Sequence, residues 1–162
     1  MKGIIISKKG KIYYKEIEDP KIKKGYAKVK VKAAGLCGSD VQRIYDKNAL
    51  KSQKTNIFGH EIAGVIEEIR RIRSNKTSLK KGDRVVINPL IRKENEDITK
   101  AKSIGKDFPG GFAEYVLVPY RNLRKIPKEV SFEEATLVDS IAVAFHGYLL
   151  ANSPKGKEIL II

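Results

Sequence analysis

The stretch Gly35-Leu36-Cys37-Gly38-Ser39-Asp40 decides how this sequence is interpreted, together with Gly59-His60-Glu61-Ile62-Ala63-Gly64, whose histidine follows the cysteine by 23 residues. A thiolate, an imidazole and a carboxylate are ligands of a catalytic zinc that keeps one position open. The flanking glycines allow sharp turns and the close approach of a ligand. Taken alone, Cys37 could be a small buried apolar residue and His60 an ordinary hydrogen-bonded polar group. The two stretches together, in this order, predict a metal site.

Four motifs in a fixed order carry a family resemblance: CGSD, GHEIAGVIEEI, KKGDRVV and GGFAEYVLVP. With them the sequence resembles the zinc-dependent medium-chain alcohol and polyol dehydrogenases, most closely those of the sorbitol and galactitol-phosphate type. The resemblance extends from about Ile5 to Ile162 and covers nearly the whole chain. It implies a mainly β (α+β) fold, a GroES-like catalytic domain that holds zinc and receives a small-molecule alcohol or polyol.

Length and composition agree with one domain of this kind. The chain has 162 residues, of which 41% are hydrophobic, and can bury a real core. No apolar stretch is long enough to span a bilayer, and the first residues lack the apolar core of a signal peptide. The single cysteine cannot form an internal disulfide, which favours a cytoplasmic location.

The formal net charge of +14 raises the alternative of a nucleic-acid-binding module. In Lys28-Val29-Lys30-Val31-Lys32-Ala33, however, lysines alternate with apolar residues, as on the solvent face of a half-buried strand. Basic runs interleaved with aromatics are absent. We therefore expect no nucleic-acid or membrane partner and a solvated lysine surface. Attraction of anionic substrates or of an acidic partner remains a smaller alternative.

Period-two patterns and turn signals predict most of the strands. These are expected at Gly3–Ser7, Lys11–Ile17, Ala27–Ala33, Ile62–Ile72, Arg84–Asn88 and Phe112–Val118. A short helix is expected from Gly38 to Asp46, with Ser39 or Asp40 as its cap.

The clearest predicted helix begins at Ser131, where Ser131-Phe132-Glu133-Glu134 is a capping box. The following residues to Ala151 are mostly apolar, so we expect this helix, or a broken pair of helices, to be buried on several sides. Glu158–Ile162 is expected as a short buried strand. The resemblance makes it the first strand of a Rossmann domain, and we expect a catalytic domain over residues 1–154 and a truncated or absent dinucleotide-binding domain from residue 155. The Gly-rich turn that would hold NAD(P) in the complete enzyme does not occur within the chain, so the chain alone is expected to be inactive and to have no cofactor-binding residues of its own.

The resemblance suggests three or four metal ligands. Cys37 and His60 are two, and Asp139 falls where polyol dehydrogenases commonly carry a glutamate ligand, although it could instead cap a break in the helix. Glu61 could bind the metal directly, orient a ligand from the next layer, or form a structural salt bridge. Consecutive residues of a regular strand point to opposite faces, so His60 and Glu61 can share a metal only if the backbone is irregular there.

Ser39 stands where the family carries a hydroxyl that binds the substrate alcohol and relays its proton, and it is our second catalytic candidate beside Glu61. Asp40 is expected to fix the local backbone. Gln42 occupies the position at which many relatives extend the relay with a histidine. The interval Pro89–Pro109 contains no cysteine, so we expect one catalytic zinc and no structural zinc.

The prediction from sequence is therefore the catalytic portion of a zinc-dependent, NAD(P)-linked alcohol or polyol dehydrogenase, with sugar-alcohol phosphates among its candidate substrates and a homo-oligomer as the complete enzyme. The alternatives are a zinc-free or degenerate scaffold of the same fold and a non-enzymatic binding module for acidic partners.

Overall fold

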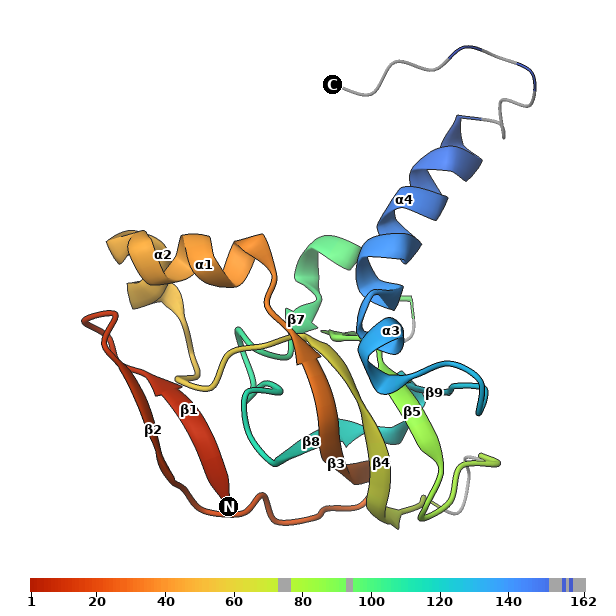
Figure 1. The fold of residues 1–162 in the computed structure, drawn as a ribbon, viewed down its shortest axis with the longest axis horizontal. Coiled ribbons are helices and arrows are strands. Elements are labelled where there is room, and N and C mark those ends of the chain that lie inside the picture. The colour runs from red at the N-terminus through yellow and green to blue at the C-terminus, as the bar shows by residue number, and fades with distance from the viewer. Residues whose placement is uncertain (73–76, 93–94, 152–155, 157, 159–162) are drawn as a thin grey trace.

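The computed structural model describes residues 1–72, 77–92, 95–151, 156 and 158, and these residues form a strand-rich α+β fold (Figure 1). The strands are β1 (Lys2–Ile6), β2 (Ile12–Glu16), β3 (Tyr26–Gly35), β4 (Glu61–Arg70), β5 (Arg84–Ile87), β6 (Leu90–Ile91), β7 (Lys102–Ser103), β8 (Tyr115–Pro119) and β9 (Leu123–Lys125). The helices are α1 (Gly38–Tyr45), α2 (Lys47–Ser52), α3 (Phe132–Thr136) and α4 (Val138–Leu150), with single 3-10 turns at Ile98–Lys100 and Tyr120–Asn122. All six strands expected from the period-two patterns are present, and the mainly β prediction is confirmed.

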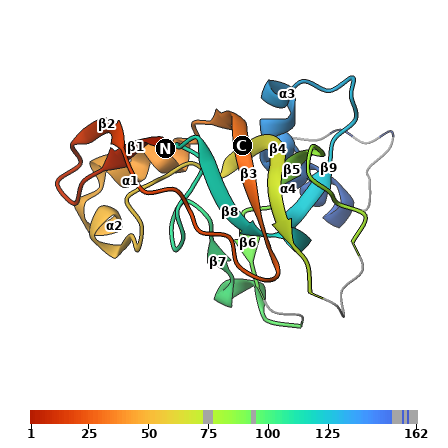
Figure 2. The same cartoon turned by 90° about the horizontal axis from the view of Figure 1, so that it is seen from below.

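The central sheet is curled. Its five strands follow the order β8-β3-β4-β5-β9, and each neighbouring pair is antiparallel. The two outer strands are consecutive in sequence, separated only by Tyr120–Asn122, and Figure 2 shows β8 leading directly into β9. So short a connection reaches at most about 14 Å, whereas the outer strands of a flat five-stranded sheet lie about 19 Å apart. The sheet is therefore bent toward a partly closed barrel.

The main core lies on the concave face of this sheet. On β3, Ala27 and Val29 are fully buried, while Lys30 is exposed, as the alternation of lysines and apolar residues predicts. The remaining core residues come from the other four strands of the sheet, from two loops and from the 3-10 turn between β8 and β9. They are Ile62, Ile66, Leu79, Val85, Ile87, Ile104, Val116, Val118, Tyr120 and Leu123.

Helix α3 covers part of the opposite face, where Ala135 packs against Ala63 and Val86. The predicted capping box starts this helix. The Ser131 hydroxyl accepts from the Glu134 N–H at 3.1 Å, and the Glu134 carboxylate accepts from the Ser131 N–H at 2.7 Å. The predicted long helix is a broken pair, because α3 ends at Thr136 and α4 begins at Val138.

Two expectations about helices are wrong. Helix α1 is capped by Cys37 rather than by Ser39 or Asp40. Helix α4, expected to be buried on several sides, has no buried residue among its described side chains. Its apolar composition predicted burial, but α4 extends away from the sheet and none of the described elements packs along its length (Figure 1).

The predicted strand Glu158–Ile162 lies outside the described residues except for Glu158, and the proposed division at residue 154 is not tested. None of the helices in the described ranges combines the length and apolar character that crossing a bilayer requires.

Candidate metal centre

Cys37 lies at the junction between sheet and helix. Strand β3 ends at Gly35, and Cys37 has extended backbone angles (φ −77°, ψ 148°) as the residue that begins α1. Its N–H donates to Oδ2 of Asp40 at 3.3 Å, which satisfies one of the free donors at the helix start. This short junction places a half-buried thiol at the end of the sheet.

The second predicted stretch approaches the same point through an irregular turn. Gly59 has φ +86°, and a Cβ on this residue would lie 2.6 Å from the Phe112 ring, so only glycine fits. Strand β4 begins only at Glu61, which leaves His60 outside its regular pleat. His60 and Glu61 are each only 9% exposed. The irregular backbone expected from the sequence is thus present, and it lets two consecutive residues face one site.

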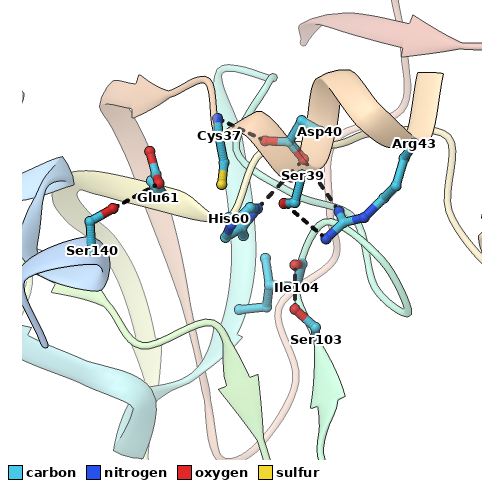
Figure 3. Close-up of polar contacts among 9 residues, drawn as sticks. All are labelled: Cys37, Ser39, Asp40, Arg43, His60, Glu61, Ser103, Ile104 and Ser140. Atoms are coloured by element: carbon cyan, nitrogen blue, oxygen red, sulfur yellow. Dashed lines mark hydrogen bonds and ion pairs between the residues drawn. The ribbon is translucent and has the colours of Figure 1, made fainter. Parts of the chain in front are cut away.

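Cys37, His60 and Glu61 form one group of metal-capable side chains. One ligand atom from each lies within 4.8 Å of those from the other two, and no other such group of three or more occurs among the described residues. Figure 3 shows the three side chains converging from the start of α1 and the start of β4. A zinc ion lies about 2.0–2.3 Å from its nitrogen, oxygen and sulfur ligands, so separations of this size suit one ion bound between the three. The donor set fits zinc.

Asp40 lies directly behind His60 and is completely buried. Its Oδ1 is 3.5 Å from Nδ1 of His60 and 3.3 Å from Nη1 of Arg43. The Asp40 carboxylate, through its hydrogen-bonding proximity and then its charge, raises the pKa of His60 above its ordinary value, while burial opposes the shift. At 3.5 Å the contact is not a regular hydrogen bond, and the buried Nδ1 has no other partner. With Nδ1 directed at Asp40, Nε2 is the nitrogen available to a metal.

Arg43 connects this carboxylate to the predicted catalytic hydroxyl. Its Nη2 donates to Oγ of Ser39 at 3.2 Å, while Nη1 contacts Asp40. Ser39 therefore lies in the first turn of α1, beside the metal-capable group, with its hydroxyl oriented by a cation (Figure 3). Arg43 was not predicted, although its spacing of three and four residues from Asp40 and Ser39 places all three on one helix face.

Glu61 contacts two other elements. A Cβ on Gly35, its partner across the β3–β4 pair, would overlap Oε2, so glycine makes room for this carboxylate. Its Oε1 accepts from Oγ of Ser140, on the first turn of α4, at 3.5 Å. Ser140 was not predicted; only its place beside Asp139 could have suggested it.

Asp139 lies outside the three-residue group. It lines a cavity of about 420 Å³ between α4 and strand β5, together with Asn88, Arg124 and His146. The arrangement brings together three of the four predicted ligands, and metal binding by Asp139 stays a prediction.

Comparison with known proteins gives one family and a consistent set of relatives. Residues 23–128 match the family described as the alcohol dehydrogenase GroES-like domain. Galactitol 1-phosphate 5-dehydrogenase of Escherichia coli (strain K12) is 30% identical over 172 aligned positions, which cover 100% of this chain and 48% of that enzyme. Sorbitol dehydrogenase 2 of Saccharomyces cerevisiae is 30% identical, with 98% of this chain and 47% of that enzyme covered.

The fold agrees with these relatives. The crystal structure of galactitol-1-phosphate dehydrogenase from Escherichia coli superposes with a TM-score of 0.82 at 30% identity, covering 94% of this chain and 45% of that one. The chain thus spans about half the length of the curated relatives it matches.

Proposed function

Since this chain belongs to the alcohol dehydrogenase GroES-like domain family, as its motifs predicted, we propose that it is the zinc-binding catalytic domain of an NAD(P)-linked alcohol or polyol dehydrogenase. The observation that carries the proposal is the convergence of Cys37, His60 and Glu61 within 4.8 Å of one another. A degenerate scaffold would have no reason to keep a thiol, an imidazole and a carboxylate together in a buried corner, where unpaired polar groups are costly.

A zinc ion held here would act as a Lewis acid and lower the pKa of a substrate hydroxyl. Residues of the chain itself then move the proton and orient the metal-capable side chains. The Ser39 hydroxyl, held by Arg43, accepts the hydroxyl proton of the substrate and passes it outward. Asp40 keeps the His60 ring oriented, because its carboxylate faces Nδ1 from a fully buried position. Gln42 cannot titrate, so a longer proton path continues through water.

Glu61 serves in this proposal as a metal ligand or as a carboxylate that exchanges with the substrate. Its carboxylate is held between the Ser140 hydroxyl, which donates to Oε1, and Gly35, whose lack of a side chain makes room for Oε2. Asp139 is proposed as the further ligand that the family resemblance predicts, and one helical position separates it from Ser140. A single zinc per chain is expected, since the described residues form one metal-capable group and the sequence has one cysteine.

The names of the relatives and the charge of the chain support a polyol or sugar-alcohol phosphate as substrate. Two of the relatives described above are named for galactitol 1-phosphate and for sorbitol. A net charge of +14 raises the local concentration of an anionic substrate. NAD(P) as hydride acceptor, a homo-oligomeric complete enzyme and a cytoplasmic location belong to the same proposal and rest on the family resemblance and the cysteine count.

Metal analysis with matched variants tests the proposal. The purified protein, supplied with zinc and freed of excess ion, should retain about one zinc per chain. Cys37→Ser combined with His60→Ala should abolish this retention, whereas His146→Ala, at the only other histidine, should leave it unchanged. Retention of two tightly held ions, or full retention by the double variant, would contradict the assignment. A folded protein with no zinc affinity would favour the zinc-free scaffold.

A further inference from the structure

Strand β2 is a free sheet edge. Among the strands that the structure describes, its only sheet neighbour is β1, whose other side is already occupied. On that side the Ile4 N–H donates to Phe112 at 2.7 Å, the Ile6 N–H donates to Asn56 at 2.8 Å, and the Lys2 carbonyl accepts from Glu114 at 3.0 Å. The small sheet therefore cannot grow beyond β1, and β2 is the edge that stays open. Both views show β2 on the outside of the molecule (Figures 1 and 2).

The direction of the backbone groups follows from these bonds. Successive residues of a strand direct their N–H and C=O groups to opposite sides. Because Lys2, Ile4 and Ile6 bond away from β2, the residues between them, Gly3 and Ile5, bond toward it.

The register then fixes the orientation of β2. Gly3 pairs with Lys15, and Ile5 with Tyr13, so Lys15 and Tyr13 bond to β1. The backbone groups of Ile12, Tyr14 and Glu16 consequently point outward, and none of them is hydrogen-bonded to another described residue. These three residues therefore present three N–H donors and three C=O acceptors with which another strand can pair.

The side chains of this edge favour association over solvation. Every residue of β2 is exposed, and three of the five are apolar or aromatic: Ile12, Tyr13 and Tyr14. Tyr14 is 70% exposed. The strand contains neither a proline nor a bulge, two of the usual features that block an edge, and its charged residues are Lys15 and Glu16 at its C-terminal end.

We propose that β2 pairs antiparallel with β2 of a second copy of this chain, about a two-fold axis that passes beside Tyr14. Outward-facing residues must oppose outward-facing residues, so only registers that match Ile12, Tyr14 and Glu16 with one another are allowed. A shift in one direction would place Lys15 opposite Lys15, and a shift in the other would place Lys11 opposite Lys15; like charges in these positions are destabilising.

The central register avoids both conflicts. It sets Tyr14 against Tyr14 and Ile12 against Glu16, and it sets Lys15 against Tyr13, a pairing of ammonium and aromatic ring that is attractive. The same kind of contact already occurs within the chain, where Nζ of Lys28 lies 4.4 Å from the centre of the Tyr115 ring. The result is a continuous four-stranded sheet in the order β1-β2-β2-β1.

One pair of five-residue strands makes a small interface, so the association is concentration-dependent rather than permanent. It does not depend on the metal centre or on the proposed function, since β2 contributes no residue to that site.

Charged substitutions of Tyr14, the residue beside the two-fold axis, test the register of the β2–β2 pair. In sedimentation velocity at physiological ionic strength, where salt screens the repulsion between two chains of net charge +14, the wild-type protein should shift from one to two chains per particle as its concentration rises. Tyr14→Lys and Tyr14→Glu should each remain monomeric, because every such charge would face its own copy. An equimolar mixture of the two variants should regain the dimer, because lysine then faces glutamate.

Matched controls are Tyr45→Lys and Tyr45→Glu, which make the same charge changes at a tyrosine that is 82% exposed on α1. They should dimerise like the wild type. A wild-type protein that stays monomeric at all concentrations would overturn the proposal. So would a Tyr14→Lys variant that associates as strongly as the wild type, which would assign association to another surface such as α4. A mixture that fails to dimerise would overturn it as well.

Discussion

Replacing Asp40 by asparagine tests the contribution of the carboxylate that lies behind the proposed metal ligand His60. Asp40 is fully buried and its two oxygens face three groups: the Cys37 N–H, the Arg43 guanidinium and Nδ1 of His60. Asparagine keeps the volume but retains one acceptor oxygen and no charge, so at least one of these contacts is lost. Outer-layer changes of this kind reduce metal affinity by about 10–100-fold, which corresponds to about 1.4–2.7 kcal/mol. Complete burial places Asp40→Asn toward the upper end of this range.

The assay is competition for zinc between the metal-free protein and a coloured chelator, with circular dichroism as the check on folding. Glu67→Gln, an exposed carboxylate on β4 paired with Lys81, is the matched control and should bind zinc like the wild type. A folded Asp40→Asn variant that binds zinc within about two-fold of the wild type would refute the role of Asp40, since a ligand-orienting carboxylate must be worth more than that.

Three further outcomes are expected. Gly35→Ala should weaken zinc binding, because the added Cβ would overlap the Glu61 carboxylate. Gly38→Ala should not weaken it, because a Cβ there would meet nothing within 4 Å. Equal zinc affinities of the two variants would contradict the position of Glu61. The backbone N–H of Ser131, and then its hydroxyl, lower the pKa of Glu134 below its ordinary 4.5, so the capping box stabilises the fold above that pH and loses this effect as the pH falls through the lowered pKa. Thermal unfolding should therefore separate wild type from Glu134→Gln at pH 6 and not at pH 2; a constant gap would exclude the charged cap. Finally, the 162 residues alone should not reduce NAD(P) with a panel of polyols, because positioning the nicotinamide supplies much of the rate; steady turnover abolished by Ser39→Ala would prove this wrong.

The longer strands and the start of α3 were predictable because their sequence patterns depend on residues that are close together along the chain. Alternating burial marks β3, and the hydroxyl-to-carboxylate spacing marks the start of α3, so both follow from neighbouring residues. Strands of two or three residues, such as Leu90–Ile91 and Leu123–Lys125, are too short for any periodicity and depend on distant pairing. The exposure of α4 could not be predicted either, because apolar composition favours burial but does not provide a partner surface.

The metal-capable group was likewise predictable only in part. The motifs around Cys37 and His60 indicated the metal-capable residues, and Gly59 indicated the irregular backbone that brings Glu61 alongside. The contacts that support them join residues from different elements, as between Asp40 and His60 or between Ser140 and Glu61, and no sequence spacing encodes such distances. The cap of α1 shows a limit of residue preferences. Serine and aspartate are favoured as caps, yet the cap is Cys37, two residues before Ser39 and three before Asp40, and Asp40 instead accepts a bond from the N–H of Cys37.

The single turn Tyr120–Asn122, which connects both outer strands of the curled sheet, also determines how the domain is expected to fold. Strand β8 joins β3 about ninety positions away along the chain, and β9 immediately afterwards joins β5 at the opposite edge. One short segment thus connects the strands at the two edges of the sheet. Both strands are able to pair only after the polypeptide up to residue 125 has emerged from the ribosome. Loop closure over such separations is slow, and a sheet fastened in this way has no stable half-formed state. We expect the five strands to form and melt as one cooperative unit, with β8 and β9 contributing late in synthesis and together.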